Sequence, residues 1–315
     1  MMPHSTTVSF ADPYEYQAAV RGSDIKIFPT APGDYHAELT LIDLHRLWMA
    51  SGRASLPQVA HIKVAFSRNP IFFLADAQQK SIRHGGIDFS SDDIMLTPSG
   101  SENHQSAPAG AGWRTMSLTS EDYAAVGRAI SGSELIVPTE TTRIRPPPYL
   151  LTRLRSLHQA ACQLAANAPD VLANPEVARL LEQELERAMV GCLTDSTGAA
   201  IHAASHPRRP VMRRFEEYLD GNQDRPLHLA EVCAAIGVAE RTLHIHCVDN
   251  LRMPPHRYLL LRRMNLARRA LAQADPKATT VTQIATEFGF WELGRFAVTY
   301  RQLFGEVPSV TLHRV

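Results

Sequence analysis

The sequence has few cysteines and no long apolar segment. Its 315 residues include only four cysteines, Cys162, Cys192, Cys233 and Cys247, and no CxxC pair. A disulfide framework is therefore not expected, and this usage is typical of a reducing compartment. No stretch approaches the roughly 20 apolar residues that span a membrane, and the N-terminus lacks the charged start and apolar run of a signal peptide. We expect a cytoplasmic protein with no membrane partner.

Motifs of common enzyme classes are also missing. The chain contains neither a GxSxG nucleophile turn nor a GxxxxGK[ST] phosphate loop. Several histidines of the first half lack the HxH pair with downstream Glu and His that a cupin metal site needs: His36, His45, His61, His84 and His104. We predict no enzymatic activity, no metal and no cofactor, with these histidines at the surface or in a pocket. No cysteine has a Lys or Arg beside it, so core packing is favoured over oxidant sensing.

Net charge is zero overall but differs between the two parts of the chain. Residues 207–315 hold 16 Lys and Arg against 11 Asp and Glu, whereas residues 1–206 hold 16 against 21. All but one of the 16 basic residues in the C-terminal part are arginines, whose forked guanidinium suits phosphate and guanine. This excess favours a polyanion as the partner of the C-terminal part.

Short strand-like segments fill residues 25–120. Alternating or apolar runs such as "VAHIKVAFSRNPIFFLAD" are separated by Pro and Gly breakers, which indicates a β-sandwich or small barrel. Residues 97–112, "TPSGSENHQSAPAGAG", read as a long polar loop. Residues 120–132 predict a helix with Ser120 as its N-cap. Two more helices are expected at about 149–167 and 175–193 as an antiparallel pair, followed by a linker at 196–210.

The C-terminal part contains an internal repeat. Val232-Cys233 and Gly237-Val238 match Ile284-Ala285 and Gly289-Phe290, 52 residues later. After one extra residue in the second turn, the following four matches lie 53 residues apart: Leu243 with Phe296, Cys247 with Tyr300, Leu251 with Phe304, and Pro255 with Pro308. Eight matched positions with a single insertion indicate a duplicated structural unit.

Each matched residue type has a physical role. A small residue lets a second helix cross closely, and the glycine adopts positive φ where the first helix ends. Val238 or Phe290 fills the gap between the helices. Residues spaced i, i+4, such as Leu243 and Cys247, form the buried face of the second helix and leave its other face free. This is the helix-turn-helix arrangement, at about 229–250 and 281–304, whose second helix enters the DNA major groove.

A long helix is expected between the two copies. Residues 255–276 combine a broad apolar face with Arg262, Arg263, Arg268 and Arg269. About 19 helical residues span roughly 28 Å, which is compatible with placing two recognition helices about 34 Å apart in successive major grooves. An all-helical packing or dimerisation domain is the alternative, and the duplicated turn, the basic excess and the connector length disfavour it.

These residues resemble the AraC/XylS family of bacterial transcription regulators. The resemblance covers about 211–315 and is carried by "LAEVCAAIGVAERTLHIHC", "RYLLLRRMNLARRAL" and "VTQIATEFGFWELGRFAVTYRQLFGEVP". It implies an all-α domain of two helix-turn-helix motifs joined by a long helix, and an activator that contacts RNA polymerase from tandem half-sites. Residues 1–145, notably "HGGIDFSSDDIMLTPSG", are similar to the family's cupin-like, β-rich effector domain, and 146–195 to its helical pair. The implied fold class is α+β.

The resemblance also implies DNA-contacting positions. In the first recognition helix these are Glu240, Arg241, Thr242, His244 and Ile245, and in the second Leu293, Gly294, Arg295 and Val298. Arg241 can fork onto guanine and His244 can donate to a base or phosphate, whereas the second set has one strong reader, Arg295. The first motif is therefore expected to carry most base specificity. Two departures, Cys247 for Phe and Arg252 for Gly, make the packing and the turn of the first motif the weakest part of the match.

The sequence therefore predicts a homodimeric, effector-responsive regulator that binds double-stranded DNA. The apolar stripes of the helical pair either form the dimer interface, which we favour because a dimer doubles the DNA contacts, or pack on the β-rich domain. The alternative function is a regulator whose N-terminal domain only dimerises or binds a protein. The sequence does not identify an effector or its binding residues.

Overall fold

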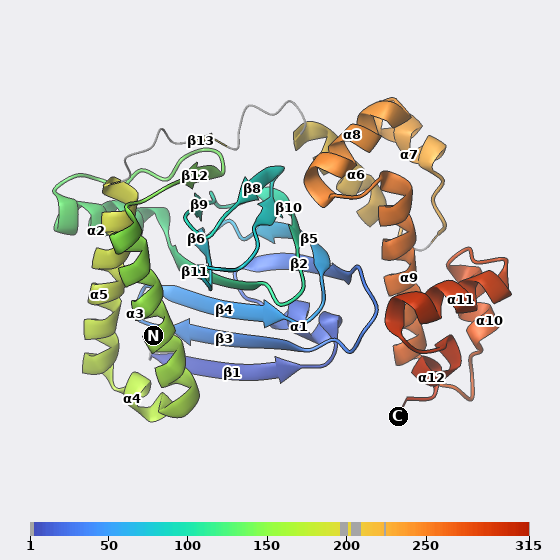
Figure 1. Ribbon diagram of the computed structural model, residues 1–315, viewed down its shortest axis with the longest axis horizontal. Coiled ribbons are helices and arrows are strands. Elements are labelled where there is room, and N and C mark those ends of the chain that lie inside the picture. Colours follow the sequence, from blue (N-terminus) through green and yellow to red (C-terminus); the bar gives the residue numbers. More distant parts are fainter. Residues whose placement is uncertain (1–2, 196–200, 203–208, 224, 315) are drawn as a thin grey trace.

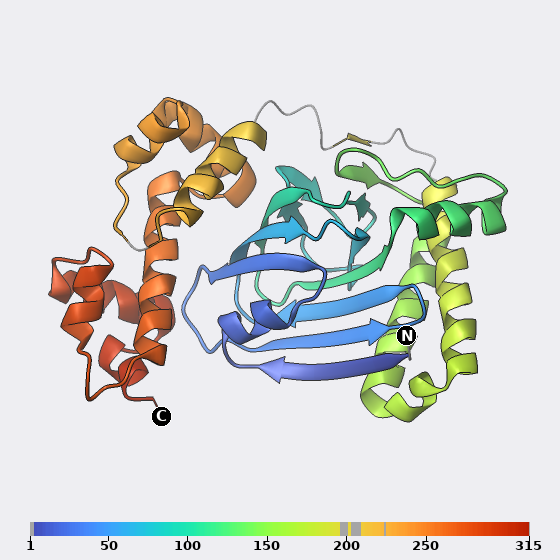
Figure 2. The same cartoon turned by 180° about the vertical axis from the view of Figure 1, so that it is seen from behind.

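A β-sandwich forms the middle of the protein, with helices at both ends (Figure 1 and Figure 2). The computed structural model describes residues 3–195, 201–202, 209–223 and 225–314. A helical hairpin covers one end of the sandwich, and an all-α domain lies at the opposite end. This α+β architecture confirms the fold class expected from the sequence.

The sandwich consists of two antiparallel sheets. The larger has the order β1-β3-β4-β11-β6-β9-β12-β13 and the smaller β2-β5-β10-β7-β8. The strands of the larger sheet are β1 (His4–Phe10), β3 (Ala37–Asp43), β4 (Trp48–Ala54), β11 (Gly112–Leu118), β6 (Asn69–Leu74), β9 (Ile94–Leu96), β12 (Thr142–Ile144) and β13 (Ile201–His202). Those of the smaller sheet are β2 (Ser23–Pro29), β5 (Gln58–Val64), β10 (Glu102–Ala107), β7 (Ile82–His84) and β8 (Ile87–Phe89). β1 and the helix α1 (Pro13–Ala19) precede the region in which the sequence predicted strands.

The predicted polar loop at residues 97–112 is wrong. This segment contains β10, which pairs with β5 and β7 in the middle of the smaller sheet. Its side chains alternate between two polar surroundings: Asn103 and Gln105 face the space between the sheets, while His104 faces the all-α domain. The strand therefore lacks the apolar alternation that identifies a half-buried strand in a sequence.

The helices after the sandwich follow the prediction closely. The N-cap of α2 (Ser120–Ser131) is Thr119, one residue earlier than the predicted Ser120, and its hydroxyl accepts a hydrogen bond from the amide of Asp122. α3 (Pro148–Asn167) and α5 (Pro175–Thr194) form the antiparallel hairpin, with the short α4 (Pro169–Ala173) between them. Their inner faces, including Leu154 and Leu185, belong to the same buried core as the strands of the larger sheet. Much of the apolar stripe of the helical pair therefore packs against the β-sandwich of the same chain.

The C-terminal domain is wholly helical where the structure describes it. Its helices are α6 (Arg209–Asp220), α7 (Leu229–Ile236), α8 (Glu240–Leu251), α9 (Pro255–Gln273), α10 (Val281–Glu287), α11 (Leu293–Phe304) and α12 (Pro308–Leu312). Most of the predicted linker at 196–210 lies outside the described residues. Across the described helices, none is both long and apolar enough to cross a membrane.

Candidate nucleic-acid interface and a cavity between the sheets

The first helical pair of the repeat is α7 and α8. Gly237 ends α7 with φ +68°, a left-handed conformation that glycine adopts without a Cβ penalty. The amide of Val238 then donates to the carbonyl of Cys233 at 3.0 Å. α8 buries Leu243, Cys247 and Leu251, as the repeat predicted. Cys247 stands where the resemblance predicts Phe, and we therefore expected weaker packing there. Its side chain is nevertheless fully buried, so the first motif packs around the smaller residue.

The opposite face of α8 is open to solvent. Glu240, Arg241 and His244 are exposed, Ile245 is 42% exposed and Thr242 is half-buried. Val248, one turn after His244, is also exposed on this helix. The residues proposed from the sequence therefore share one accessible surface at the start of α8.

The second helical pair is α10 and α11. α10 begins with a capping box in which Thr280 and Gln283 bond each other's backbone amides. Gly289 has φ +72°, and the amide of Phe290 donates to the carbonyl of Ala285 at 2.8 Å. Phe296, Tyr300 and Phe304 form the buried face of α11, which confirms the alignment of the two copies.

The exposed face of α11 is more apolar than that of α8. Leu293 is 39% exposed and Val298 57%, and Gly294 and Arg295 are also open to solvent. Trp291, just before the helix, is 74% exposed, and the sequence analysis did not single it out. The sequence did offer a signal for it: a large aromatic residue stands just before the second helix of this pair and has no counterpart in the first copy.

The arginines of α9 do not form a single basic face. Arg262 is buried and bonds Glu216 and Asp220 of α6. Arg263 and Arg268 lie over the rings of Phe290 and Phe304, at 4.3 and 4.9 Å. α9 therefore uses these cations mainly for packing.

Arg252 adopts a left-handed conformation in the turn that follows α8. Its φ is +56°, the only positive φ outside glycine in the described chain, and its amide donates to the carbonyl of Val248 at 3.0 Å. The doubt about this turn is resolved, because the turn is retained despite the strain of about 1 kcal/mol or more. The guanidinium pairs with Asp88 of β8, so it joins the turn to the sandwich.

Comparison with known proteins agrees with this geometry. Residues 232–314 match a family model described as a helix-turn-helix domain. The matched residues include most of α7 and all of α8, α10 and α11, so the match covers both helical pairs of the repeat. It is 39% identical over 105 residues to a probable thc operon regulatory protein of Rhodococcus erythropolis, which is 33% of this chain and 32% of the relative. It is 29% identical over 103 residues to XylDLEGF operon transcriptional activator 2 of Pseudomonas putida, 33% of this chain and 66% of that protein.

The similarity to these curated relatives is thus confined to part of their length, about one third for the Rhodococcus protein. Among solved structures, the AraC-like transcriptional activator CuxR aligns over 83% of this chain and 95% of its own, with 14% identity and a TM-score of 0.40.

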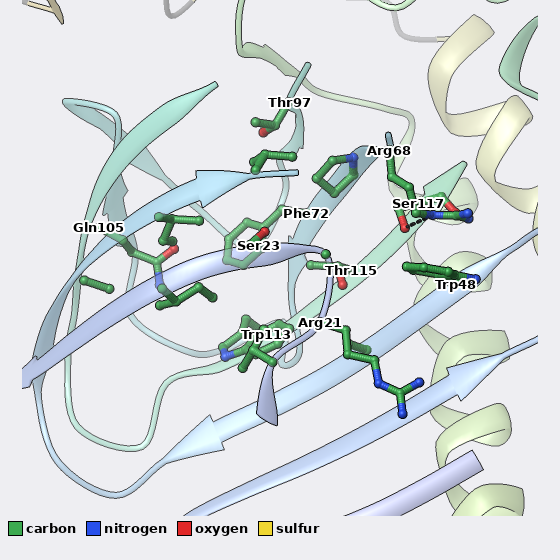
Figure 3. A pocket seen from close by; sticks show the side chains of 18 of the residues that line it. Arg21, Ser23, Trp48, Arg68, Phe72, Thr97, Gln105, Trp113, Thr115 and Ser117 are labelled. Carbon is green, nitrogen blue, oxygen red and sulfur yellow. Dashed lines mark hydrogen bonds between the residues drawn. The ribbon is translucent and has the colours of Figure 1, made fainter. Parts of the chain in front are cut away.

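A cavity of about 110 Å³ lies between the two sheets. Figure 3 shows Trp48, Phe72 and Trp113 around it, and these rings give it a largely apolar wall. Phe72 and Trp113 stack with centroids 6.5 Å apart. A Cβ at Gly52 would lie 2.4 Å from the Trp113 ring, so the glycine is what lets the indole lie across β4.

A few polar groups converge on the same space. Gln105 Oε1 lies 3.2 Å from His84 Nδ1, and Gln58 Oε1 is buried with no hydrogen-bond partner among the described residues. Arg68 lies 4.1 Å over the Trp48 ring and donates to the Ser117 hydroxyl at 3.1 Å (Figure 3). An apolar wall with few polar groups is the usual composition of a small-molecule site.

The five histidines of the first half and the four cysteines lie at the surface, in the cavity or in buried contacts. His84 lines the cavity, His36 and His45 are exposed, and His61 and His104 are buried against the C-terminal domain. Burial raises the pKa of Cys162 to about 11 and that of Cys192 to about 12, and it also raises the pKa of Cys233 and Cys247. The thiols are therefore protonated at neutral pH, as core residues are. In the part of the chain that the structure describes, no group of three or more His, Cys, Asp or Glu side chains is arranged to hold a metal ion.

Proposed function

We propose that this protein is a sequence-specific transcription regulator that binds double-stranded DNA through both helix-turn-helix motifs. The observation that carries the proposal is the duplication itself. Two glycine turns of the same conformation each present a second helix with one buried face and one open face. Open second helices of such pairs enter the major groove, and the joining helix α9 has the 19 residues that were expected of it.

We further propose that α8 reads most of the bases. Arg241 and His244 are both open to solvent on its first two turns, and an arginine can bond guanine O6 and N7 together. On α11, Arg295 is the only charged side chain among the four proposed contact positions. Leu293 and Val298 have only methyl groups with which to contact thymine.

Binding to single-base variants of a selected duplex tests this division. The duplex is first selected from random sequences with the full-length protein. We expect Arg241→Ala to weaken binding about 10- to 100-fold at one or two base positions and to relax the preference there, which corresponds to 1–3 kcal/mol. Arg295→Ala is the matched control in the other motif. A uniform loss across all base variants for Arg241→Ala would contradict base reading and leave only backbone contact.

The cavity between the sheets supports effector sensing by the N-terminal domain. Its volume is on the order of that needed for one aromatic ring, and the unpaired Gln58 oxygen supplies an acceptor for a ligand donor. The effector that fits best is a small, flat, mostly apolar molecule with one hydrogen-bond donor. A domain used only for dimerisation would not need such a cavity, so we favour sensing over that alternative.

The outer face of the hairpin is the proposed dimer contact. Leu180 of α5 is 56% exposed and Tyr149 of α3 is 69% exposed, although the inner stripe packs on the sandwich. A two-fold dimer of this kind would present four helix-turn-helix motifs and increase affinity through multivalency. Contact with RNA polymerase is proposed from the family resemblance. Molecular mass in solution tests the dimer: we expect Leu180→Glu to give a monomer, and a monomeric wild-type chain would contradict the proposal.

A further inference from the structure

The two faces of the smaller sheet contact different parts of the protein: one lines the cavity and the other packs against the C-terminal domain. On β5, Gln58, Ala60 and Ile62 line the cavity, while His61 and Lys63 point to the C-terminal domain. β2 and β10 follow the same alternation, which is the period of two of any strand. A single layer of backbone therefore separates the cavity from the surface on which the C-terminal domain docks.

A buried carboxylate lies at the centre of this docking surface. Glu216 of α6 has no exposed surface. Its Oε1 accepts hydrogen bonds from His104 Nε2 of β10 and from the Tyr258 hydroxyl of α9, both at 2.8 Å. Its Oε2 accepts one from Arg262 at 3.3 Å and lies 3.9 Å from His61 Nδ1. His61 and His104 stack with ring centroids 4.9 Å apart.

Ionic and apolar contacts surround this centre. Asp220, one turn after Glu216, accepts from Lys26 of β2 at 2.5 Å and from Arg262 at 2.7 Å. Phe28 and Val59 of the sheet join the apolar core of the C-terminal domain, and Phe28 lies 6.0 Å from the Tyr258 ring. On β7, Arg83 donates to the carbonyl of Asp249 near the end of α8.

The acidic and basic side chains around the two stacked rings balance in number. The acidic groups are Glu102, Glu216 and Asp220, and the basic groups are Lys26, Lys63 and Arg262. The groups that face the two rings are Glu102 and Lys63 from the sheet, Glu216 and Asp220 from α6, and Tyr258 and Arg262 from α9. α8, which also packs on β10, contributes the buried side chains His246 and Cys247. A proton on His104 would therefore add uncompensated charge to a buried site.

We propose that the cluster of His61, His104 and Glu216 is a latch that holds the C-terminal domain against the smaller sheet while His104 is neutral, and that opens when His104 takes up a proton. Opening frees α6 to α12 to reorient relative to the sandwich. The latch lies on the reverse side of the strands that line the cavity, so a cavity ligand and a proton act on the same sheet. The inference depends on contacts within the chain and not on the proposed reading of DNA.

The direction of the pH effect follows from burial. Burial lowers the pKa of His104 below its ordinary value, although the bond to Glu216 opposes this. Once the domains separate, the ring meets water and its pKa returns to about 6.5. The docked form therefore binds fewer protons, so docking is fully favourable above this value and is lost as the pH falls below it. One such histidine weakens docking about tenfold for each pH unit.

Small-angle X-ray scattering of the full-length protein tests the latch, with circular dichroism to follow the fold. We expect the wild-type chain to stay compact at pH 7.5 and to expand between pH 6.5 and 5 with its secondary structure intact. His104→Gln, which keeps an amide donor and cannot titrate, is expected to remove most of the expansion. His36→Gln changes an exposed histidine of the same domain and is expected to behave like wild type. Lys26→Ala is expected to expand the chain already at pH 7.5.

Three results would overturn the proposal. The first is a radius that stays constant until the circular dichroism signal is lost. The second is an equal response in wild type and His104→Gln. The third is tighter docking on acidification, which would mean that Glu216 holds His104 in its charged form. None of these readouts uses DNA, so their failure is distinct from failure of the proposed function.

Discussion

Gly289 lies directly against Pro226. A Cβ built on Gly289 would lie 2.4 Å from Cβ of Pro226. Pro226 precedes α7 in the first helix-turn-helix motif, whereas Gly289 forms the turn of the second. The glycine that ends α10 therefore also lets the two motifs approach each other, a second role that the equivalent Gly237 does not have, because its nearest such neighbour is an Arg214 nitrogen at 3.9 Å.

Alanine at the two turn glycines should have unequal effects. Gly237→Ala should cost about 1 kcal/mol, the strain of an L-residue in the left-handed region. Gly289→Ala should cost about 2–4 kcal/mol, because overpacking of 1–3 kcal/mol adds to that strain. Urea unfolding of the full chain measures both. Equal midpoints would show that Pro226 moves away freely and that the motifs are not coupled at this turn.

Arg252 combines a strained backbone with an interdomain ion pair. Arg252→Gly removes the strain and the pair, whereas Arg252→Ala removes only the pair with Asp88. We therefore expect the glycine variant to be more stable than the alanine variant by about 1 kcal/mol, a difference that thermal unfolding can measure. The exposed pair itself is worth about 0–1 kcal/mol. An alanine variant as stable as the glycine variant would contradict the strain.

Glu182 of α5 attaches the hairpin to the sandwich. Its Oε1 accepts the backbone amides of Arg46 and Leu47, each at 2.8 Å, in the turn between β3 and β4. Glu182→Ala leaves two amides unpaired and should cost about 1–3 kcal/mol in urea unfolding. Glu184, on the same helix, makes only exposed pairs with arginines. Glu184→Ala should therefore cost less than about 1 kcal/mol, and similar losses for both variants would refute the role of Glu182.

Filling the cavity should abolish effector binding without unfolding the protein. Ala50 is half-buried on β4 and lines the cavity. A compound found by thermal-shift screening of small aromatic molecules should raise the wild-type melting point, because it binds only the native state. Ala50→Leu should remove that shift. Ala160→Leu, which adds the same atoms at an exposed position of α3, should retain it. A shift that survives in Ala50→Leu would place the ligand elsewhere.

The sequence by itself determined the two helix-turn-helix motifs and the hairpin. Their signals are local: a glycine that needs positive φ, apolar residues at i and i+4, and a small residue where helices cross, all within about 25 residues. The repetition of that pattern made it specific. The same pattern also predicted that the proposed contact residues are exposed. Once the buried positions of an amphipathic helix are known, the residues on its opposite side must face solvent.

Only the tertiary structure decided what the polar residues of the sandwich do. His61, His104 and Glu216 are separated by up to 155 positions in the chain, and no local period links β5 and β10 to α6. β10 resembled a loop because both of its faces meet polar partners, one in the cavity and one in the C-terminal domain. Such pairings depend on which surfaces pack together after the strands have formed, and this long-range choice leaves no periodic pattern in the sequence.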